Sequence, residues 1–168
     1  MNPLHLTDIN EFEHVLTVLK GMPEDEKVLF KAMTGDDFDA ENVLVALADL
    51  PGTHHIVWAG ETPIAIGGFI PQRKGVVRTW FIAPDATWAA YGREVTDLCG
   101  SLIKGMLDDG LAHRIETVTL ADRTKARAWY ERIGLSFEST QRGYGSGGED
   151  AVMYVALRDT ESGGCAVA

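Results

Sequence analysis

The hydrophobic period of the chain changes within one short segment, residues 114–137. Ile115, Val118 and Leu120 give its first half the pattern of a buried strand. Its second half has apolar positions three or four residues apart, as on one face of a helix: Ala126, Trp129, Tyr130 and Ile133. Gly134 ends this helical pattern, and an apolar-x-Phe sequence then returns to a strand. The direct succession of strand, helix and strand predicts an α/β fold in which helices cover a sheet.

The size and composition of the chain predict a single domain. It has 168 residues, of which 45% are hydrophobic, and no repeat or linker divides them. We expect the domain to span residues 3–158. Residues 159–168 are polar and then small, so we expect this C-terminal tail to be flexible unless a partner holds it.

The charge of the chain excludes some classes of partner. A formal net charge of −10 argues against nucleic acid, because binding to phosphates relies on clustered positive charge. No apolar run approaches the roughly 20 residues that a membrane-spanning helix needs. The N-terminus lacks the basic and then apolar pattern of a secretion signal. We therefore expect a protein of the cytosol, without a nucleic-acid partner or a membrane span.

The cysteines and histidines predict neither a disulfide framework nor a metal site. The two cysteines, Cys99 and Cys165, lie far apart in the sequence, and no Cys/His cluster has the spacing of metal ligands. His54 and His55 are adjacent, but a strand that begins there places one imidazole on each of its faces.

The rest of the chain predicts further elements from its periodicity and from its Gly and Pro residues. Strands are expected at 3–6, 55–59, 64–71 and 76–83, and helices at 9–20, 24–33, 40–50 and 92–107. Asp37 or Asp39 is expected to cap the third of these helices. We expect residues 84–91 to form a loop. The last two strands, 137–142 and 151–158, form a hairpin around a flexible glycine-rich tip at 143–148.

This order of elements and the segment 114–137 resemble the GNAT N-acetyltransferase superfamily over residues 3–158. The family's pattern for the segment is an apolar strand, an Asn-x-x-Ala-x-x-x-Tyr helix and Gly-Phe. Ala126 matches it, whereas Arg123 stands in place of the Asn and becomes a candidate cofactor contact. The resemblance implies an α/β (α+β) GNAT fold with a mixed, mostly antiparallel sheet of about six to seven strands flanked by helices.

The resemblance implies that Tyr130 is a general acid, which protonates the thiolate of coenzyme A as it leaves. The alternative is a helix aromatic that packs beside Trp129 and Leu135. For the general base the candidates are Glu116, on the preceding strand, and His113, just before it. Each of these two residues is also an ordinary choice for a protein surface.

The resemblance also implies where acetyl-CoA binds. Its pantetheine arm would pair with the backbone of the strand that ends in Phe81, Ile82 and Ala83. Its pyrophosphate would bind the following loop, where the family pattern is Gln/Arg-x-x-Gly-x-Gly/Ala. The six matching positions are residues 87–92, and the candidate cofactor contacts among them are Thr87, Trp88, Ala90, Tyr91 and Gly92.

Of the three positions that the family pattern specifies in this loop, only the last, Gly92, matches. Thr87 replaces the Gln or Arg, and Ala90 replaces the first glycine. For phosphate binding, the missing cation at Thr87 matters more than the missing glycine at Ala90, because charge-assisted contacts to phosphate are each worth roughly 1.5–3 kcal/mol. Arg93, the next residue, is a candidate substitute for it. Two interpretations follow, a working pyrophosphate loop and a purely structural turn between strand and helix.

A second set of residues gives a narrower resemblance. Pro63-Ile-Ala-Ile-Gly-Gly68, Trp80-Phe81 and Asp85-x-x-Trp88-x-x-x-Gly92 resemble the small GNAT-like proteins of short-tailed bacteriophages, known as internal virion proteins. This resemblance covers residues 63–158. It implies a phage protein that is made in the host cytoplasm and associates with the virion, where its partners are other virion proteins or copies of itself.

Two hypotheses of function follow from these resemblances. The first is a virion-associated structural or interaction protein on a GNAT fold, with a degenerate acyl-CoA site and no required cofactor. The second is an active N-acetyltransferase that transfers an acetyl group from acetyl-CoA to a primary amine. The acidic charge of the chain suits a cationic acceptor, such as a polyamine, an aminoglycoside or a protein lysine.

Overall fold

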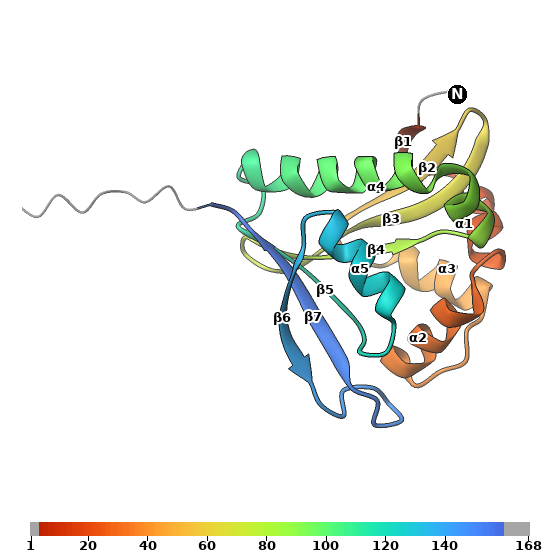
Figure 1. Ribbon diagram of the computed structural model, residues 1–168. Helices are drawn as coiled ribbons and strands as arrows, with labels where there is room; N and C mark the ends of the chain where they lie inside the picture. Colours follow the sequence, from red (N-terminus) through yellow and green to blue (C-terminus); the bar gives the residue numbers. More distant parts are fainter. Residues whose placement is uncertain (1–3, 160–168) are drawn as a thin grey trace, which may run out of the picture.

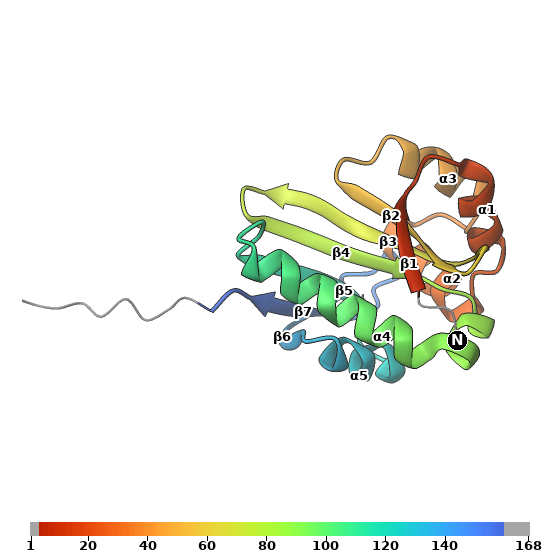
Figure 2. The same cartoon turned by 90° about the horizontal axis from the view of Figure 1, so that it is seen from above.

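The computed structural model describes residues 4–159; residues 1–3 and 160–168, and with them Cys165 and nearly all of the predicted tail, lie outside the described range. Within it the chain forms one mixed sheet with helices on both faces (Figures 1 and 2). The strands are β1 (Leu4–Asp8), β2 (Thr53–Ala59), β3 (Thr62–Arg73), β4 (Val76–Ile82), β5 (Arg114–Leu120), β6 (Ser136–Gln141) and β7 (Ala151–Leu157). The helices are α1 (Phe12–Lys20), α2 (Glu24–Thr34), α3 (Ala40–Ala48), α4 (Asp85–Asp108) and α5 (Thr124–Arg132).

The strands follow the order β1-β2-β3-β4-β5-β7-β6. Every neighbouring pair is antiparallel except β4 and β5, which are parallel. Parallel strands need a crossover connection, and α4 provides it. This sheet confirms the predicted fold class, a mixed and mostly antiparallel sheet flanked by helices.

The helices divide between the two faces of the sheet. Figure 2 shows α1 and α3 on one face and α4 and α5 on the other. Side chains alternate accordingly along β4, since Trp80 packs with the core of α1 and α3, whereas the next residue, Phe81, packs with residues of α4. Phe30 attaches α2 to the α1 and α3 face.

Asp39 caps α3 as predicted, and its side chain accepts a 2.8 Å hydrogen bond from the Asn42 amide.

The loop predicted for residues 84–91 is wrong, because α4 begins at Asp85, directly after Pro84. Pro84 has the fixed φ of proline (−59°), Asp85 places negative charge at the positive end of the helix dipole, and alanines follow. Tyr91 has non-helical backbone angles (φ −134°, ψ 15°). The helix therefore breaks at Tyr91 and resumes at Gly92, where the long helix was predicted to begin.

The glycine-rich connection between β6 and β7 is a hairpin tip, as predicted, but it is not a free one. Ser146 donates to the end of α2, from its backbone amide to the Ala32 carbonyl at 2.7 Å and from its hydroxyl to the Lys31 carbonyl at 3.0 Å. Carbonyls in the last turn of a helix have no partner within the helix, so they are available to such a loop. The predicted flexibility overlooked this contact, which joins the tip to α2.

Glu116 links β4 to β5 where these parallel strands are paired. Its carboxylate accepts hydrogen bonds from Arg78 Nη2 at 3.0 Å and Arg114 Nε at 3.1 Å, and 7% of its side chain is exposed. Burial would raise the pKa of Glu116, but the hydrogen bonds and charges of Arg114 and Arg78 outweigh burial and lower the pKa. The carboxylate is therefore ionised at neutral pH and holds the two strands together.

Glu116→Gln should lower the free energy of unfolding near pH 7 by about 3 kcal/mol, because the partly buried Arg78 loses its counter-charge and Arg114 keeps only its pair with Glu138. A group whose pKa is lowered by folding stabilises the protein above its unfolded pKa and loses that contribution as the pH falls through the folded pKa. The deficit of the variant should therefore shrink as the pH is lowered toward about 3. Urea unfolding followed by circular dichroism measures it, with Glu61→Gln in the exposed β2–β3 turn as control. The same deficit at both pH values would contradict this account.

Gly68→Ala should destabilise the sheet by at least about 2 kcal/mol, because the added Cβ would lie 2.0 Å from the Thr53 carbonyl oxygen on β2. Gly105→Ala is the matched control. Its Cβ would meet nothing within 4 Å, and its place inside α4 should make alanine stabilising by about 0.5–1 kcal/mol. Thermal unfolding of the two variants checks both signs, and an unchanged Tm for Gly68→Ala would refute this close approach of β2 and β3.

Candidate functional site

The strands β4 and β5 diverge soon after they begin. Among the residues that the structure describes they pair only over Val76↔Arg114, Val77↔Ile115 and Arg78↔Glu116. Beyond this point β4 remains paired with β3, and β5 with β7. The edges of residues 79–82 and 117–120 that face each other therefore carry backbone N–H and C=O groups without a strand partner.

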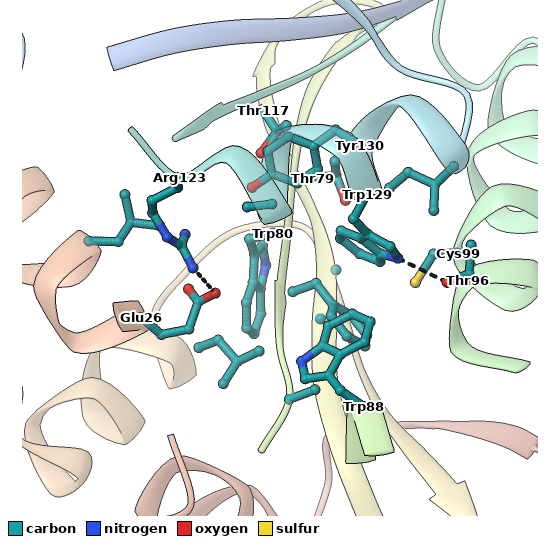
Figure 3. A pocket seen from close by; sticks show the side chains of 18 of the residues that line it. Glu26, Thr79, Trp80, Trp88, Thr96, Cys99, Thr117, Arg123, Trp129 and Tyr130 are labelled. Atoms are coloured by element: carbon teal, nitrogen blue, oxygen red, sulfur yellow. Dashed lines mark hydrogen bonds and ion pairs between the residues drawn. The ribbon is translucent and has the colours of Figure 1, made fainter. Parts of the chain in front are cut away.

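A cavity of about 920 Å³ occupies this gap. Because its walls come from helices on opposite faces of the sheet, it passes between the separated strands from one face to the other. What we call its α5 side includes Trp88, Gly92, Thr96, Cys99, Lys125, Trp129, Tyr130 and Arg132. What we call its α2 side includes Met22, Glu26, Leu29, Phe30 and Met33. Figure 3 shows Trp80 of β4 between the two sides.

Aromatic rings form much of the α5 side. The rings of Trp88 and Trp129 meet edge to face with centroids 5.2 Å apart, and Phe81 lies 5.9 Å from Trp88 and 5.6 Å from Trp129. The Trp129 indole N–H donates to the Thr96 hydroxyl at 3.1 Å, which joins α5 to α4. The predicted contacts Phe81, Ile82, Ala83 and Trp88 thus line one cavity.

The polar groups of Thr87 are used within the protein. Its side chain is buried, its hydroxyl donates to the Ile64 carbonyl at 2.6 Å, and its amide donates to the Pro84 carbonyl at 2.9 Å. Thr87, Ala90 and Tyr91 do not contribute to the cavity lining, whereas Gly92 does. Residues 85–90 thus form a helical turn where the resemblance implied a loop of free amides. Gly92, where α4 resumes after the break at Tyr91, lines the cavity, and we call this point the second start of the helix.

Two cations of α5 line the cavity. Arg93 points to solvent, with 92% of its side chain exposed and Asp97 4.0 Å away, and it does not line the cavity. Lys125 and Arg132 do line it, and neither forms an ion pair with another described residue. The sequence places Lys125 and Arg132 on the same helix face as Trp129, because they lie four residues before it and three after it. That this face packs against α4 is a tertiary feature, which the sequence alone does not show.

Tyr130 lies where the strands diverge, near Thr117 (Figure 3). Its ring packs against Tyr154, with centroids 5.5 Å apart, and against Trp129 at 5.7 Å. Burial raises the pKa of the Tyr130 phenol, and the charge of Glu26 adds to this effect, while Arg123 opposes it. Both sequence interpretations are therefore compatible with its position, since the ring packs in the core and the phenol keeps its proton at neutral pH.

The structure brings neither predicted base to the cavity. The carboxylate of Glu116 is held between two arginines, and its lowered pKa makes it a weak proton acceptor. His113 donates its amide to the Gly75 carbonyl at 2.8 Å, at the end where β4 and β5 are still paired. Cys99 lines the cavity, but burial raises the pKa of its thiol to about 12, so it is not a thiolate at neutral pH.

Arg123 reaches from the start of α5 to α2, across the open end of the gap. Its Nη2 contacts Asp25 Oδ2 at 3.0 Å and also binds Glu26 Oε1, and its Nη1 donates to the Thr119 hydroxyl at 3.2 Å. Burial raises the pKa of Glu26, and the charge and hydrogen bond of Arg123 only partly offset it. Sequence reasoning missed Glu26, because nothing local marks a helix carboxylate that meets a residue so far along the chain.

Neither a metal site nor a membrane span is found among residues 4–159. No group of three or more His, Cys, Asp or Glu side chains there is placed to hold a metal ion. None of the helices formed by these residues combines the length and apolar character needed to span a bilayer.

Known proteins resemble this chain in structure rather than in sequence. No family model matches the sequence, and no curated protein matches it significantly. A GNAT-family acetyltransferase from Bacillus anthracis superposes with a TM-score of 0.72 at 14% identity, over 95% of this chain and 97% of that one. RimL, a ribosomal alpha-N-protein acetyltransferase in complex with coenzyme A, gives 0.72 at 12% identity, over 95% and 96%.

A variant of SpeG, the spermidine N-acetyltransferase of Vibrio cholerae, gives a TM-score of 0.70 at 12% identity, over 92% of this chain and 94% of that one. None of these three names refers to a virion protein, so the narrower resemblance to phage proteins gains no support from them. Identities this low establish the fold alone. The chain has the GNAT fold, as the order of its elements predicted.

Proposed function

We propose that this protein transfers an acetyl group from acetyl-CoA to a primary amine. The observation that carries the proposal is the unpaired backbone between β4 and β5, which opens into a cavity beside a phenol that keeps its proton. Each backbone group left unpaired there lacks a hydrogen bond within the sheet, so these groups are available to a bound ligand.

The gap fits the pantetheine arm. The arm is extended and carries two amides, and the free edge of residues 79–82 offers it the hydrogen bonds of a neighbouring strand. Phe81, Ile82 and Ala83, which the resemblance assigned to this role, all line the cavity. The apolar rings of Trp88 and Trp129 beside them would exclude water from the arm.

The phosphate end would be held by a different set of groups from the family loop. Gly92 begins a helical segment that faces the cavity, and the amides at such a start favour an anion. Lys125 and Arg132 supply positive charge from α5, in place of the cation missing at Thr87. Of the predicted contacts, Gly92 keeps its assigned role in this proposal, whereas Arg123 is engaged with α2.

Tyr130 is suited to protonate the leaving sulfur. Acetyl-CoA supplies the acyl carbon as a thioester, together with a thiol as leaving group. The raised pKa of Tyr130 keeps its proton on oxygen through neutral and mildly alkaline pH, so the acid is ready before the carbon–sulfur bond breaks. Its position beside the gap puts that proton where the resemblance places the sulfur.

An amine acceptor is consistent with the names of two similar structures. SpeG is named for acetylation of spermidine, and RimL for acetylation of a protein α-amino group. In this proposal the acceptor enters from the α2 side, because the phosphate-binding groups occupy the α5 side.

A second candidate function is the virion-associated structural protein. The observation that favours it is the helical turn before Tyr91. In this turn the Thr87 hydroxyl is bound to the Ile64 carbonyl, and fewer backbone amides are free than in the family loop. In that case virion proteins or copies of the chain would be its partners, and it would leave the host cytoplasm in the phage particle. Association with virions stays a prediction from sequence, which mass spectrometry of purified particles would test.

Titration calorimetry with coenzyme A separates the two functions. The acetyltransferase should bind coenzyme A with a Kd below about 1 mM, that is, with at least about 4 kcal/mol of binding free energy. Lys125→Gln should weaken this binding about tenfold, because it removes a charge-assisted phosphate contact, whereas Lys74→Gln, in the β3–β4 turn, should leave it unchanged. Absence of binding by the wild-type protein would refute the acetyltransferase.

Tyr130→Phe should lower kcat by roughly 100-fold or more and leave the affinity for coenzyme A unchanged, because it removes the proton and keeps the ring. Tyr154→Phe is the control, since it removes a neighbouring hydroxyl that accepts from Arg127 at 3.2 Å and should affect stability rather than rate. Steady-state rates of free thiol release measure both. Equal kcat in wild type and Tyr130→Phe would remove the general acid from the proposal.

A further inference from the structure

Helix α2 turns an apolar face toward the cavity, and Phe30 of this face also packs with the core of α1 and α3. Leu29, Phe30 and Met33 line the α2 side, together with Met22 just before the helix. Within α2 itself only Ala32 is fully buried. Val28, next to Leu29 in sequence, lies on the other side of the helix, with 59% of its surface exposed. The α2 side therefore offers a partly open apolar wall.

The wall opposite α2 is also apolar. Trp80 of β4 stands in the middle of the cavity, and its indole ring separates the Glu26 and Arg123 pair from Trp88 and Trp129 (Figure 3). Gly67 and Gly68 of β3 continue this wall without side chains. A ligand on the α2 side thus meets thioether, aliphatic and aromatic groups over most of its surface.

One end of this apolar space is acidic. Asp25 and Glu26 share the single guanidinium of Arg123, so the three groups together carry a formal charge of −1. Arg123 binds Oε1 of Glu26, and Oε2 accepts no hydrogen bond from any residue that the structure describes. The end of the apolar wall is therefore ready to receive one positive or proton-donating group.

From these contacts we infer that the α2 side binds a primary amine whose nitrogen is attached to an apolar or aromatic body, and that Glu26 receives the proton of that amine. The inference rests on the proposed function and names the acceptor class for the same site. The body lies between α2 and Trp80, and the nitrogen lies at the Glu26 end, on the side of Tyr130.

The ammonium form of the amine first loses one proton to solvent, and from the neutral amine onward the proton balance of the transfer is complete with these two residues. The lone pair of the neutral amine forms a bond with the thioester carbonyl carbon, and the carbon–sulfur bond breaks. The nitrogen loses a proton to Glu26, and the sulfur gains one from Tyr130. Burial raises the pKa of Glu26 toward the range in which a carboxylate accepts a proton well, while Arg123 on α5, Asp25 on α2 and the Tyr130 phenol set the local charge.

A polyamine or an aminoglycoside does not suit this wall. Such an acceptor carries several ammonium or hydroxyl groups, and each one that is buried without a hydrogen-bond partner lowers the affinity. The acidic net charge of the chain favoured these acceptors from sequence. On the α2 side, however, the lining carboxylates are Asp25 and Glu26, and Arg123 already neutralises half of their charge.

Titration of the wild-type protein with small amines tests the acceptor class. Phenethylamine and octylamine should bind at least tenfold more tightly than spermidine, and phenethyl alcohol, which lacks the amine, should bind more weakly than phenethylamine. The same amines should be the better substrates when acetyl-CoA is added. Tighter binding of spermidine, or no binding of either apolar amine, would overturn the inference.

A matched pair of variants on α2 tests the location. Leu29→Glu places a carboxylate in the apolar wall and should weaken the binding of phenethylamine about tenfold. Val28→Glu makes the same change one residue earlier, on the exposed side of the helix, and should leave that binding unchanged. Circular dichroism confirms that both variants fold. Equal effects of the two variants would place the acceptor elsewhere.

A second pair tests the proton acceptor. Glu26→Gln keeps an oxygen for Arg123 but cannot take a proton, so kcat/KM should fall about 100-fold and its acid limb should disappear from the pH profile. That limb should lie above the ordinary range of a glutamate, because the base works when deprotonated and its pKa is raised. Glu24→Gln, on the exposed first turn of α2, should keep both the rate and the limb. An unchanged acid limb in Glu26→Gln would overturn its role.

These experiments separate the inference from the proposed function. If the wild-type protein fails to bind coenzyme A, the acetyltransferase is refuted, while the amine titrations still report on the α2 side. If coenzyme A binds and spermidine is preferred over the apolar amines, the acetyltransferase stands and this inference alone is wrong.

Discussion

The three-residue pairing of β4 with β5 is the constraint on which the rest of the structure depends. Glu116 and its two arginines hold the strands together at that point, and beyond it the sheet divides. This clamp stabilises the pairing from which the strands then diverge. Since β4 stays paired with β3 and β5 with β7, the divergence leaves one gap with free backbone groups. The cavity, the aromatic wall and Tyr130 are all placed relative to that gap.

Much of the fold was predictable because the spacing of apolar residues along the chain indicates its helices and strands. The strands, the helix around Tyr130 and the crossover between β4 and β5 follow from apolar spacing and from Gly or Pro at the ends of elements. The helical turn after Pro84 was not predictable in this way, because alanines and the buried Thr87 hydroxyl form a helix where the family pattern implied a loop. The docking of Ser146 on α2 was missed for the same kind of reason, since it is a tertiary contact between distant segments.

The candidate site divides in the same way. The family resemblance singled out Phe81, Ile82, Ala83, Trp88, Gly92 and Tyr130 in the sequence, and all six line the cavity, whereas Thr87, Ala90 and Tyr91, singled out in the same way, do not. The resemblance did not single out Glu26, Lys125 and Arg132. Glu26 reaches the cavity because Arg123 joins α2 to the start of α5. Lys125 and Arg132 reach it because α5 packs against α4. A charged residue on an exposed helix face looks the same in sequence whether that face meets solvent or a cavity, so only the packing of the helices distinguishes the two.

Arg123 shows how the departures from the family pattern are connected. At the position of the family's Asn, a longer and charged side chain crosses the open end of the gap and binds both carboxylates of α2. Without it, Asp25 and Glu26 would together carry a charge of −2, and α2 would lose these two ion pairs to the start of α5. With it, one oxygen of Glu26 is fixed and the other is left to a ligand. The same residue that departs from the family pattern therefore reduces the negative charge at the acidic end of an otherwise apolar cavity. It also links the residue that would accept a proton to the helix that carries the residue that would donate one.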